Sequence, residues 1–241
     1  MILVESDNMD AAFHFSVEEL FTRYIRSNTP VLMLWRTVKT VMLGNNQVVN
    51  AEIDIEFAMT SGIQIVRRSS GGGAIFTDPG TVLYTVIEPL ISNTSTHREK
   101  VASSVIDALG TMGVTASREG RNDILIEGKK ISGFAQYTSG NHVCTHGSLL
   151  YDTDLDTLTD VLIANPAKLQ PKGISSIKSR VTNIKDYTQE KYPLGEFIVK
   201  LKTELLRGKN YKTYSFNSME KEIISRIYNE RYSNQEWNLR K

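Results

Sequence analysis

Two arginines and two hydroxyl side chains stand directly before three consecutive glycines in the segment from Arg67 to Asp78. Glycine adopts backbone φ angles that are closed to other residues, so the N–H groups of residues 71–73 can come against a ligand without hindrance from a side chain. The guanidinium groups of Arg67 and Arg68 would add charge-assisted donors beside them. This combination favours a binding site for an anion, although a glycine-rich hairpin that binds nothing has a similar composition.

A second group of polar side chains lies within residues 120–136. Asn122 and Asp123 enter one predicted strand and Lys130 opens the next, with a glycine-containing turn between them. Pairing of the two strands would bring an amide, a carboxylate and an ammonium group to one end of the sheet. Asp123 is therefore a candidate ligand of a hydrated Mg²⁺, and Lys130 can neutralise a phosphate or an oxyanion. A solvated basic turn is the alternative, but Gly133 inside the predicted strand indicates close approach by a ligand or another backbone.

A third group lies within residues 171–183, where hydroxyl groups and cations alternate with few large apolar side chains. Such a composition is typical of an exposed loop. The loop either orders over an anionic ligand or remains a solvated basic surface segment.

The elements that must hold these groups are predicted from hydrophobic spacing. A helix is expected from Asp10 to Ile25, and His14 on it is expected to pack or to be partly exposed rather than to bind a ligand. The glycines are expected to form a turn between the strands 63–66 and 74–76. The remaining expected elements are strands at 31–35, 41–43, 81–87, 124–126, 130–134 and 142–149, and helices at 100–109, after 154, near 197–205 and at 218–232.

Composition sets the broad class of protein. The chain has 241 residues, 40% of them hydrophobic, and a formal net charge of +1, so it can bury a large core and carries no bulk field toward nucleic acid or an anionic membrane. Its single cysteine, Cys144, excludes an internal disulfide. The N-terminus lacks the features of a signal peptide and no apolar stretch is long enough to span a membrane. We therefore expect one cytoplasmic domain over residues 1–241.

Taken together, the three groups resemble the lipoate-protein ligase A family. The matching motifs are RRSSGGGA with its following Asp78, then GRND with GKKISG and Gln136, then HGSLLYD at 146–152 and KGISSIKSRVTN from Lys172. The resemblance extends from the N-terminal helix to about Asn183. It implies an α/β (α+β) fold of mixed and antiparallel sheets flanked by helices, similar to biotin protein ligases. It also implies a short form, a single catalytic domain without a separate C-terminal accessory domain.

The resemblance further implies an activity. The family activates lipoate with ATP and Mg²⁺ to lipoyl-AMP and transfers the lipoyl group to a lysine of a carrier, either a glycine-cleavage H-like protein or a dehydrogenase E2 lipoyl domain. A separate accessory protein is a candidate partner. By resemblance, Lys130 is the catalytic residue that contacts the lipoyl carbonyl and the α-phosphate. The residues that would bind ATP or lipoyl-AMP are Arg68, Ser70, Gly71, Gly72, Gly73, Ala74, Phe76, Thr77, Asn122, Asp123, Lys130, His146, Gly147, Ser148, Lys172, Ser179 and Arg180.

Two departures from the family pattern concern the packing of adenine, because Thr77 and Thr145 stand where histidines are common. Two other functions stay open. An ATP-independent octanoyl or lipoyl transferase would need a cysteine nucleophile, for which Cys144 is the only candidate, although it is more simply a small core residue. A noncatalytic protein that binds lipoyl carriers is the third possibility, against which the presence of Lys130 and Asp123 argues.

Overall fold

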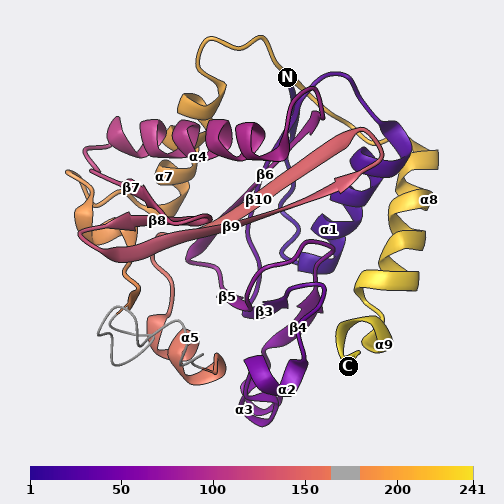
Figure 1. Cartoon of the computed structure of the whole chain (residues 1–241), viewed down its shortest axis with the longest axis horizontal. Helices are drawn as coiled ribbons and strands as arrows, with labels where there is room; N and C mark the ends of the chain where they lie inside the picture. Colours follow the sequence, from indigo (N-terminus) through magenta and orange to yellow (C-terminus); the bar gives the residue numbers. More distant parts are fainter. Residues whose placement is uncertain (164–179, 241) are drawn as a thin grey trace.

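The computed structural model describes residues 1–163 and 180–240, and within them it forms a mixed α/β fold of two sheets (Figure 1). The larger sheet has eight strands in the order β11-β1-β2-β6-β10-β9-β8-β7, and the smaller has the order β4-β3-β5. The predicted fold class is confirmed. In the large sheet the strands are β1 (Ile2–Val4), β2 (Val31–Trp35), β6 (Thr81–Pro89), β7 (Ser117–Glu119), β8 (Asp123–Ile126), β9 (Lys129–Ser139), β10 (His142–Leu150) and β11 (Lys212–Thr213).

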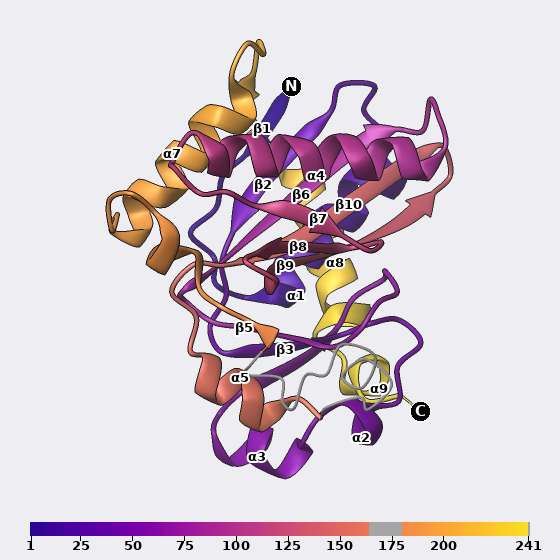
Figure 2. The ribbon, with the colours of Figure 1, turned by 60° about the vertical axis from the view of Figure 1, so that its left-hand side comes forward.

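Helices cover both faces of the large sheet (Figures 1 and 2). One face packs against α4 (Thr94–Gly110) and α7 (Leu194–Leu206), and the other against α1 (Ala11–Glu19) and α8 (Ser218–Ile227). Because side chains alternate along a strand, each strand of the sheet centre contributes to both cores. On β6, Val82 and Tyr84 pack on the α4 side, whereas Leu83 and Ile87 pack on the α1 side.

The N-terminal helix matches the predicted range. It begins after Asp10, whose carboxylate accepts a hydrogen bond from the backbone N–H of Ala12, and it continues beyond α1 as the wider turn η1 (Leu20–Ile25). The helix predicted at 100–109 begins earlier, at Thr94, because the side chain of Asn93 caps it by accepting from the N–H of Thr96. A cap of this kind lies outside the apolar stripe, so hydrophobic spacing alone places the start of the helix too late.

The hairpin of β8 and β9 is present as predicted. Ile126 pairs with Lys129, which leaves Glu127 and Gly128 as a two-residue turn. Both turn residues have positive φ, 48° and 76°, as a type I′ turn requires. The sequence Glu-Gly-Lys therefore sets the position of Lys130 at the start of the returning strand.

The small sheet differs from the prediction. It consists of β3 (Thr40–Leu43), β4 (Gln64–Arg67) and β5 (Ile75–Thr77), backed by α2 (Val49–Glu52), α3 (Ile55–Thr60) and α5 (Leu155–Val161). The glycines connect β4 to β5 as expected, but these strands are not neighbours, because β3 lies between them, parallel to the first and antiparallel to the second. The glycine segment therefore crosses over the end of β3.

The last part of the described chain returns to the glycine segment. After α8, the turn η5 (Tyr228–Tyr232) leads to α9 (Gln235–Asn238), and the short η4 (Ile184–Tyr187) precedes α7. The indole N–H of Trp237 donates to the carbonyl of Arg67 at 2.8 Å, and the side chain of Asn238 accepts from the N–H of Arg67 at 2.8 Å. In residues 1–163 and 180–240, no helix is long and apolar enough to cross a membrane.

Candidate active site

A cavity of about 670 Å³ lies where the glycine segment, the β8–β9 hairpin and β10 converge. The predicted binding residues that line it are Arg68, Gly72, Gly73, Ala74, Phe76, Asn122, Asp123, Lys130, His146, Gly147, Ser148 and Arg180. The three groups of residues, far apart in the sequence, thus meet around one space. Pockets for small molecules commonly have volumes of about 300 to 1,000 Å³, and this one falls in that range.

Arg68 holds the glycine segment in place through backbone carbonyls. Arg68 is 4% exposed, and its guanidinium group donates to the carbonyls of Met42 (2.8 Å), Gly71 (2.9 Å) and Gly73 (2.7 Å). Burial lowers the pKa of Arg68 to about 10, and the charge of Glu18 opposes that shift. Arg68 therefore shapes the segment through its carbonyls as well as lining the cavity.

Arg67 has a purely structural environment. It is completely buried, and it donates to the carbonyls of Gly44 (2.9 Å), Gln47 (2.7 Å) and Arg240 (3.0 Å). The expectation that both arginines add donors for an anion is wrong for Arg67. Backbone carbonyls surround the Arg67 guanidinium group in place of an anion, an arrangement that the sequence does not reveal.

Two glycines at this turn are required by close contacts. Gly72 has a φ of 97°, and a Cβ there would lie 3.0 Å from Nη2 of Arg68. A Cβ on Gly44 would overlap the carbonyl oxygen of Gly72. The loop that follows β3 and the glycine segment therefore pack backbone against backbone.

The β8–β9 hairpin brings Asp123 and Lys130 together as predicted. Nζ of Lys130 lies 2.8 Å from Oδ1 of Asp123. Asp123 pairs with Gly133, and a β-bulge shifts the register between Ile124 and Leu125. A Cβ on Gly133 would lie 2.8 Å from Nζ of Lys130, so the lysine side chain lies across the glycine. Close approach by a ligand or another backbone was expected at Gly133, but in the structure the side chain of Lys130 makes it.

Arg180 joins this group from the other side. The N–H of Thr182 donates to the carbonyl of Lys130 at 3.1 Å, and Nη2 of Arg180 lies 3.0 Å from Oδ2 of Asp123. Both carboxylate oxygens of Asp123 are thus in ion pairs. A Mg²⁺ ligated by Asp123 would have to displace Lys130 or Arg180, so the arrangement does not fit a metal ligand as it stands. Lys172 and Ser179 lie outside the described residues.

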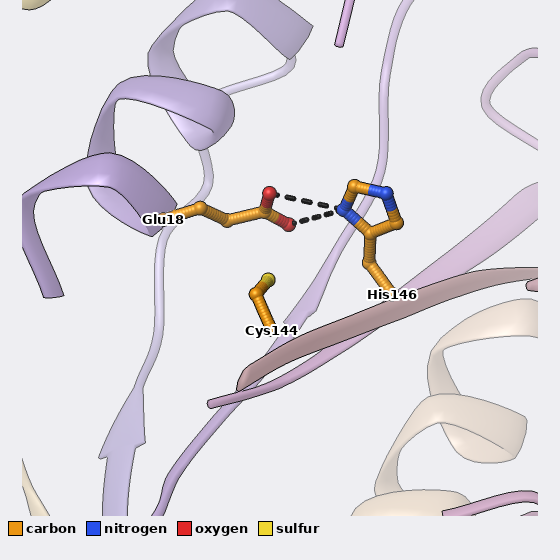
Figure 3. A group of neighbouring side chains, drawn as sticks. All are labelled: Glu18, Cys144 and His146. Carbon is orange, nitrogen blue, oxygen red and sulfur yellow. Dashed lines mark hydrogen bonds and ion pairs between the residues drawn. The ribbon is translucent and has the colours of Figure 1, made fainter. Parts of the chain in front are cut away.

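His146 is held at the inner end of the cavity by buried polar groups. Figure 3 shows Glu18 reaching from α1 toward His146 on β10, with Cys144 beside them. Nδ1 of His146 lies 3.0 Å from each carboxylate oxygen of Glu18, and Nε2 lies 2.6 Å from Oγ of Ser70. Burial raises the pKa of the Cys144 thiol well above its usual range, and the charge of Glu18 raises it further. The thiol is therefore protonated, which does not suit a nucleophile.

Several predicted residues do not line the cavity. Ser70 is completely buried behind it, and Gly71 is exposed. Thr77 is buried, and its hydroxyl lies 2.7 Å from the hydroxyl of Thr37. Thr145 accepts from the side-chain amide of Gln136 at 2.7 Å. The two threonines that depart from the family pattern are thus engaged in bonds within the sheets.

Sequence reasoning did not single out Glu18, Trp35 or Phe15. Trp35 and Phe15 line the cavity, and Glu18 is 1% exposed behind it. A signal for Glu18 exists in the sequence, because it falls three residues before Phe21 and four after His14, on the buried side of the predicted helix. A carboxylate at such a position must have hydrogen-bond partners.

The fold and the cavity are those of an α/β protein that binds a small molecule, and a comparison with known families identifies the family. Residues 10–206 match the family model described as the lipoyl protein ligase A/B catalytic domain, and the chain belongs to this family. The resemblance found in the motifs is confirmed.

Individual relatives agree with this assignment. The chain is 31% identical over 242 residues to lipoate-protein ligase LplJ of Bacillus subtilis, an alignment that covers 99% of this chain and 73% of LplJ. It is 28% identical to lipoate-protein ligase 1 of Staphylococcus aureus, with the same two coverages. Among solved structures, a lipoate-protein ligase A bound with ATP has a TM-score of 0.86 at 23% identity, covering 99% of this chain and 97% of that chain. The bi-partite lipoate protein ligase of Thermoplasma acidophilum has a TM-score of 0.83 at 24% identity, covering 99% and 95%.

Proposed function

We propose that this protein is a lipoate-protein ligase that activates lipoate with ATP to lipoyl-AMP and transfers the lipoyl group to a lysine of a carrier protein. The curated relatives are named lipoate-protein ligases, and one structural neighbour was solved with ATP and another with lipoic acid. The observation that carries the proposal is the position of Lys130, an ammonium group 2.8 Å from Asp123 in the polar part of the cavity.

The cavity has two chemically different parts that suit an acyl adenylate. Its apolar lining includes Phe15, Trp35, Met42 and Leu83, where an acyl chain can be buried. Its polar lining includes the 120–123 segment with Lys130 and Arg180, which suits a phosphate and a ribose. The carboxylate of lipoate would thus lie at the boundary between the two parts.

The chemistry needs cations and backbone donors rather than a covalent nucleophile. A carboxylate oxygen of lipoate attacks the α-phosphorus of ATP, the bond from that phosphorus to the bridging oxygen breaks, and pyrophosphate leaves. The uncharged ε-amine of the carrier lysine then attacks the carbonyl carbon of the mixed anhydride, loses a proton and releases AMP. Lys130 stabilises the negative charge that develops on the α-phosphate in the first step and on the carbonyl oxygen in the second.

The remaining predicted residues have supporting roles in this proposal. Gly72 and Gly73 present backbone to the adenylate and Ala74 and Phe76 line the cavity beside them, while Gly71 and Thr77 support the segment from outside the cavity. Asn122 and Asp123 bind the nucleotide side, while Gly147 and Ser148 form one wall of the cavity. Mg²⁺, when bound, would neutralise the phosphates of ATP; no step above depends on Asp123 as its ligand.

Arg180 and the segment before it would exclude water from the intermediate. Arg180 is tied to Asp123 and the backbone of Thr182 to Lys130, so residues 180–182 lie beside the polar part of the cavity. Lys172 and Ser179 are proposed to act with it. An anhydride kept dry survives until the carrier arrives.

The described residues are proposed to act as one catalytic unit, since α9 contacts the strand before the glycine segment. The carrier is proposed to be an E2 lipoyl domain or a glycine-cleavage H-like protein. One structural neighbour is a bi-partite lipoate ligase described together with its E2 lipoyl domain, which supports the first type of carrier. A separate accessory protein remains a candidate partner for activation. A cytoplasmic location is proposed because Cys144 is a free thiol.

The direct test is a reconstituted assay with the purified chain, ATP, Mg²⁺, lipoate and each type of carrier. We expect a carrier mass increase of one lipoyl group on a single lysine, together with pyrophosphate release that depends on lipoate. Whether activation requires a separate accessory protein is tested by measuring lipoyl-AMP formation with and without added cell extract. Transfer from an acylated carrier in the absence of ATP would instead establish the transferase, and carrier binding without modification would establish a noncatalytic protein.

A further inference from the structure

A continuous chain of hydrogen bonds runs through the interior from Trp35 to Arg68. The indole N–H of Trp35 lies 3.1 Å from the hydroxyl of Thr85, which lies 2.7 Å from Oε1 of Glu18. Glu18 is bonded to Nδ1 of His146, and Nε2 of His146 is bonded to Ser70 (Figure 3). Nε of Arg68 donates to the Ser70 hydroxyl at 3.0 Å. The chain connects helix α1, strand β10 and the glycine segment.

The groups at the two ends of this chain set the direction of their own bonds. Trp35 can only donate, so the Thr85 oxygen accepts and its hydrogen goes to Glu18. Arg68 also can only donate, so the Ser70 oxygen accepts from it, and Ser70 forms a second bond with Nε2 of His146 at 2.6 Å. The other acceptor near Ser70, the Gly71 carbonyl, is 3.4 Å away and is a poorer partner.

The Glu18 carboxylate determines the position of one hydrogen on His146. An ionised carboxylate has only acceptors, so Nδ1 carries the hydrogen of this bond and donates to Glu18. Thr85 and His146 thus both donate to Glu18. A buried carboxylate at Glu18 and a buried guanidinium group at Arg68 are joined through His146 and Ser70.

We propose that Glu18 is a positioning residue for the adenylate site: through His146 and Ser70 it fixes Arg68 and thereby the conformation of the glycine segment. This inference rests on the proposed ligase function for its kinetic consequences. Arg68 donates hydrogen bonds to the carbonyls of Gly71 and Gly73, so a change in its position moves the backbone that lines the cavity. Removal of the charge of Glu18 leaves Arg68 buried without its counter-charge, and the segment loosens.

The bonds among Ser70, His146 and Glu18 also have the distances of a nucleophile with its base and its orienting carboxylate. Burial argues against that role, because Ser70 has no exposed surface and its oxygen already accepts from Arg68. The same atoms serve positioning rather than attack. Replacement of Ser70 in the experiment below distinguishes the two roles.

The test compares wild type with Glu18→Gln, which keeps the shape of the side chain and removes its charge. The tautomer of His146 is read from the ¹⁵N shifts of its ring, which are assignable because the chain has four histidines. Wild type should show hydrogen on Nδ1, whereas Glu18→Gln should show a mixture of tautomers, because an amide can accept from or donate to Nδ1. Hydrogen exchange at the amides of residues 71–73 should accelerate in the variant, measured on the free protein.

The kinetics of adenylate formation test the functional consequence of this positioning. Adenylate formation by Glu18→Gln should lose about tenfold in kcat, with KM for ATP changed less than about threefold, because the positioning acts on the transition state. Ser70→Ala should lower kcat similarly while His146 keeps hydrogen on Nδ1. His142→Gln is the matched control, since His142 is buried on the same strand but its ring bonds to the carbonyl of Ser27, outside the Glu18 network, and it should leave the His146 tautomer and the exchange unchanged.

The outcomes separate this inference from the proposed function. If wild type makes no lipoyl-AMP, the ligase proposal fails, while the tautomer and the exchange still test the positioning by Glu18. If wild type is active and Glu18→Gln retains its kcat, its tautomer and its glycine protection, the positioning role is overturned. Trapping of an acyl group on Ser70 in wild type would replace it with a nucleophilic role.

Discussion

The ammonium group of Lys130 lies across Gly133 and reaches Asp123, with 2.8 Å between Nζ and Oδ1. The backbone pairing of Asp123 with Gly133 makes this contact possible, because the missing side chain leaves room for the lysine. The lysine is therefore held in a fixed direction before any ligand is bound. Preorganised charge of this kind is the main source of stabilisation for a developing oxyanion.

Replacement of Lys130 by alanine should give a folded protein that does not form lipoyl-AMP at a useful rate. The loss should be on the order of two to four kcal/mol in the activation barrier, the size attached to one preorganised donor in acyl chemistry. Lipoate-dependent pyrophosphate release measures it. Lys129→Ala is the control, because Lys129 is an exposed neighbour on the same strand and should keep full activity. Release by Lys130→Ala at the rate of wild type would remove Lys130 from the mechanism.

Gly133→Ala should weaken catalysis with little effect on folding. The new methyl group would lie 2.8 Å from Nζ of Lys130, and this flexible end can swing away from Asp123 at small cost. We expect activity to fall about tenfold or more while the melting temperature changes by a few degrees at most. In Gly195→Ala the added Cβ meets nothing within 4 Å, so this variant should behave as wild type. Full activity in Gly133→Ala would show that the position of Lys130 over the glycine is unimportant.

Cys144→Ser should retain ATP-dependent ligation. The thiol is fully buried and its pKa is raised by burial and by Glu18, so it is not a thiolate at neutral pH. The assay measures carrier lipoylation with and without ATP in wild type and variant. Loss of all transfer in a well-folded variant, or an acyl thioester found on Cys144, would favour the transferase.

Arg180→Ala should uncouple ATP consumption from carrier modification. Without the ion pair between Arg180 and Asp123, residues 180–182 are held less firmly beside the polar part of the cavity, and water can reach the anhydride. The ratio of AMP released to carrier lipoylated should rise above that of wild type. Lys185→Ala, which removes a surface ion pair with Asp152, is the comparison and should leave the ratio unchanged. A ratio that stays constant in both variants would limit Arg180 to a structural role.

His14 should make the protein less stable in mild acid. Burial lowers its pKa from 6.5 to about 4, an effect that hydrogen bonding to the Asn8 carbonyl and the charges of Glu18 and Asp10 oppose. Between these pH values the unfolded chain binds more protons than the folded one, so the unfolding free energy falls as pH falls from 6.5 toward 4. The loss attributable to this group is about 3 kcal/mol at most.

Denaturant unfolding at several pH values checks the sign and the size of this effect. His14→Gln removes the titrating group and should flatten the dependence between pH 6.5 and 4. An equally steep dependence in the variant would assign it to other groups. The prediction that His14 packs is confirmed, because its ring stacks on Trp35 with centroids 4.5 Å apart.

The sequence by itself determined the local features of the site. Interactions between residues close in the chain determine the Glu127-Gly128 turn and the position of Lys130 after it. They also determine the contact between Lys130 and Gly133. Short-range backbone geometry depends on a few neighbouring residues, so these features could be predicted. The family motifs likewise identified most of the residues that line the cavity.

Only the tertiary structure decided which partners the polar groups have. The bond from Glu18 to His146 joins residues 128 positions apart, and the contacts of Arg67 with α9 span about 170. The insertion of β3 between β4 and β5 likewise depends on packing between distant segments. The N–H donors of a guanidinium group can bond either to an anion or to backbone carbonyls. Which acceptor they have depends on the groups that the fold places around the arginine. For Arg67 and Arg68 the fold placed carbonyls there, and Arg68 holds the glycine segment in place through Gly71 and Gly73.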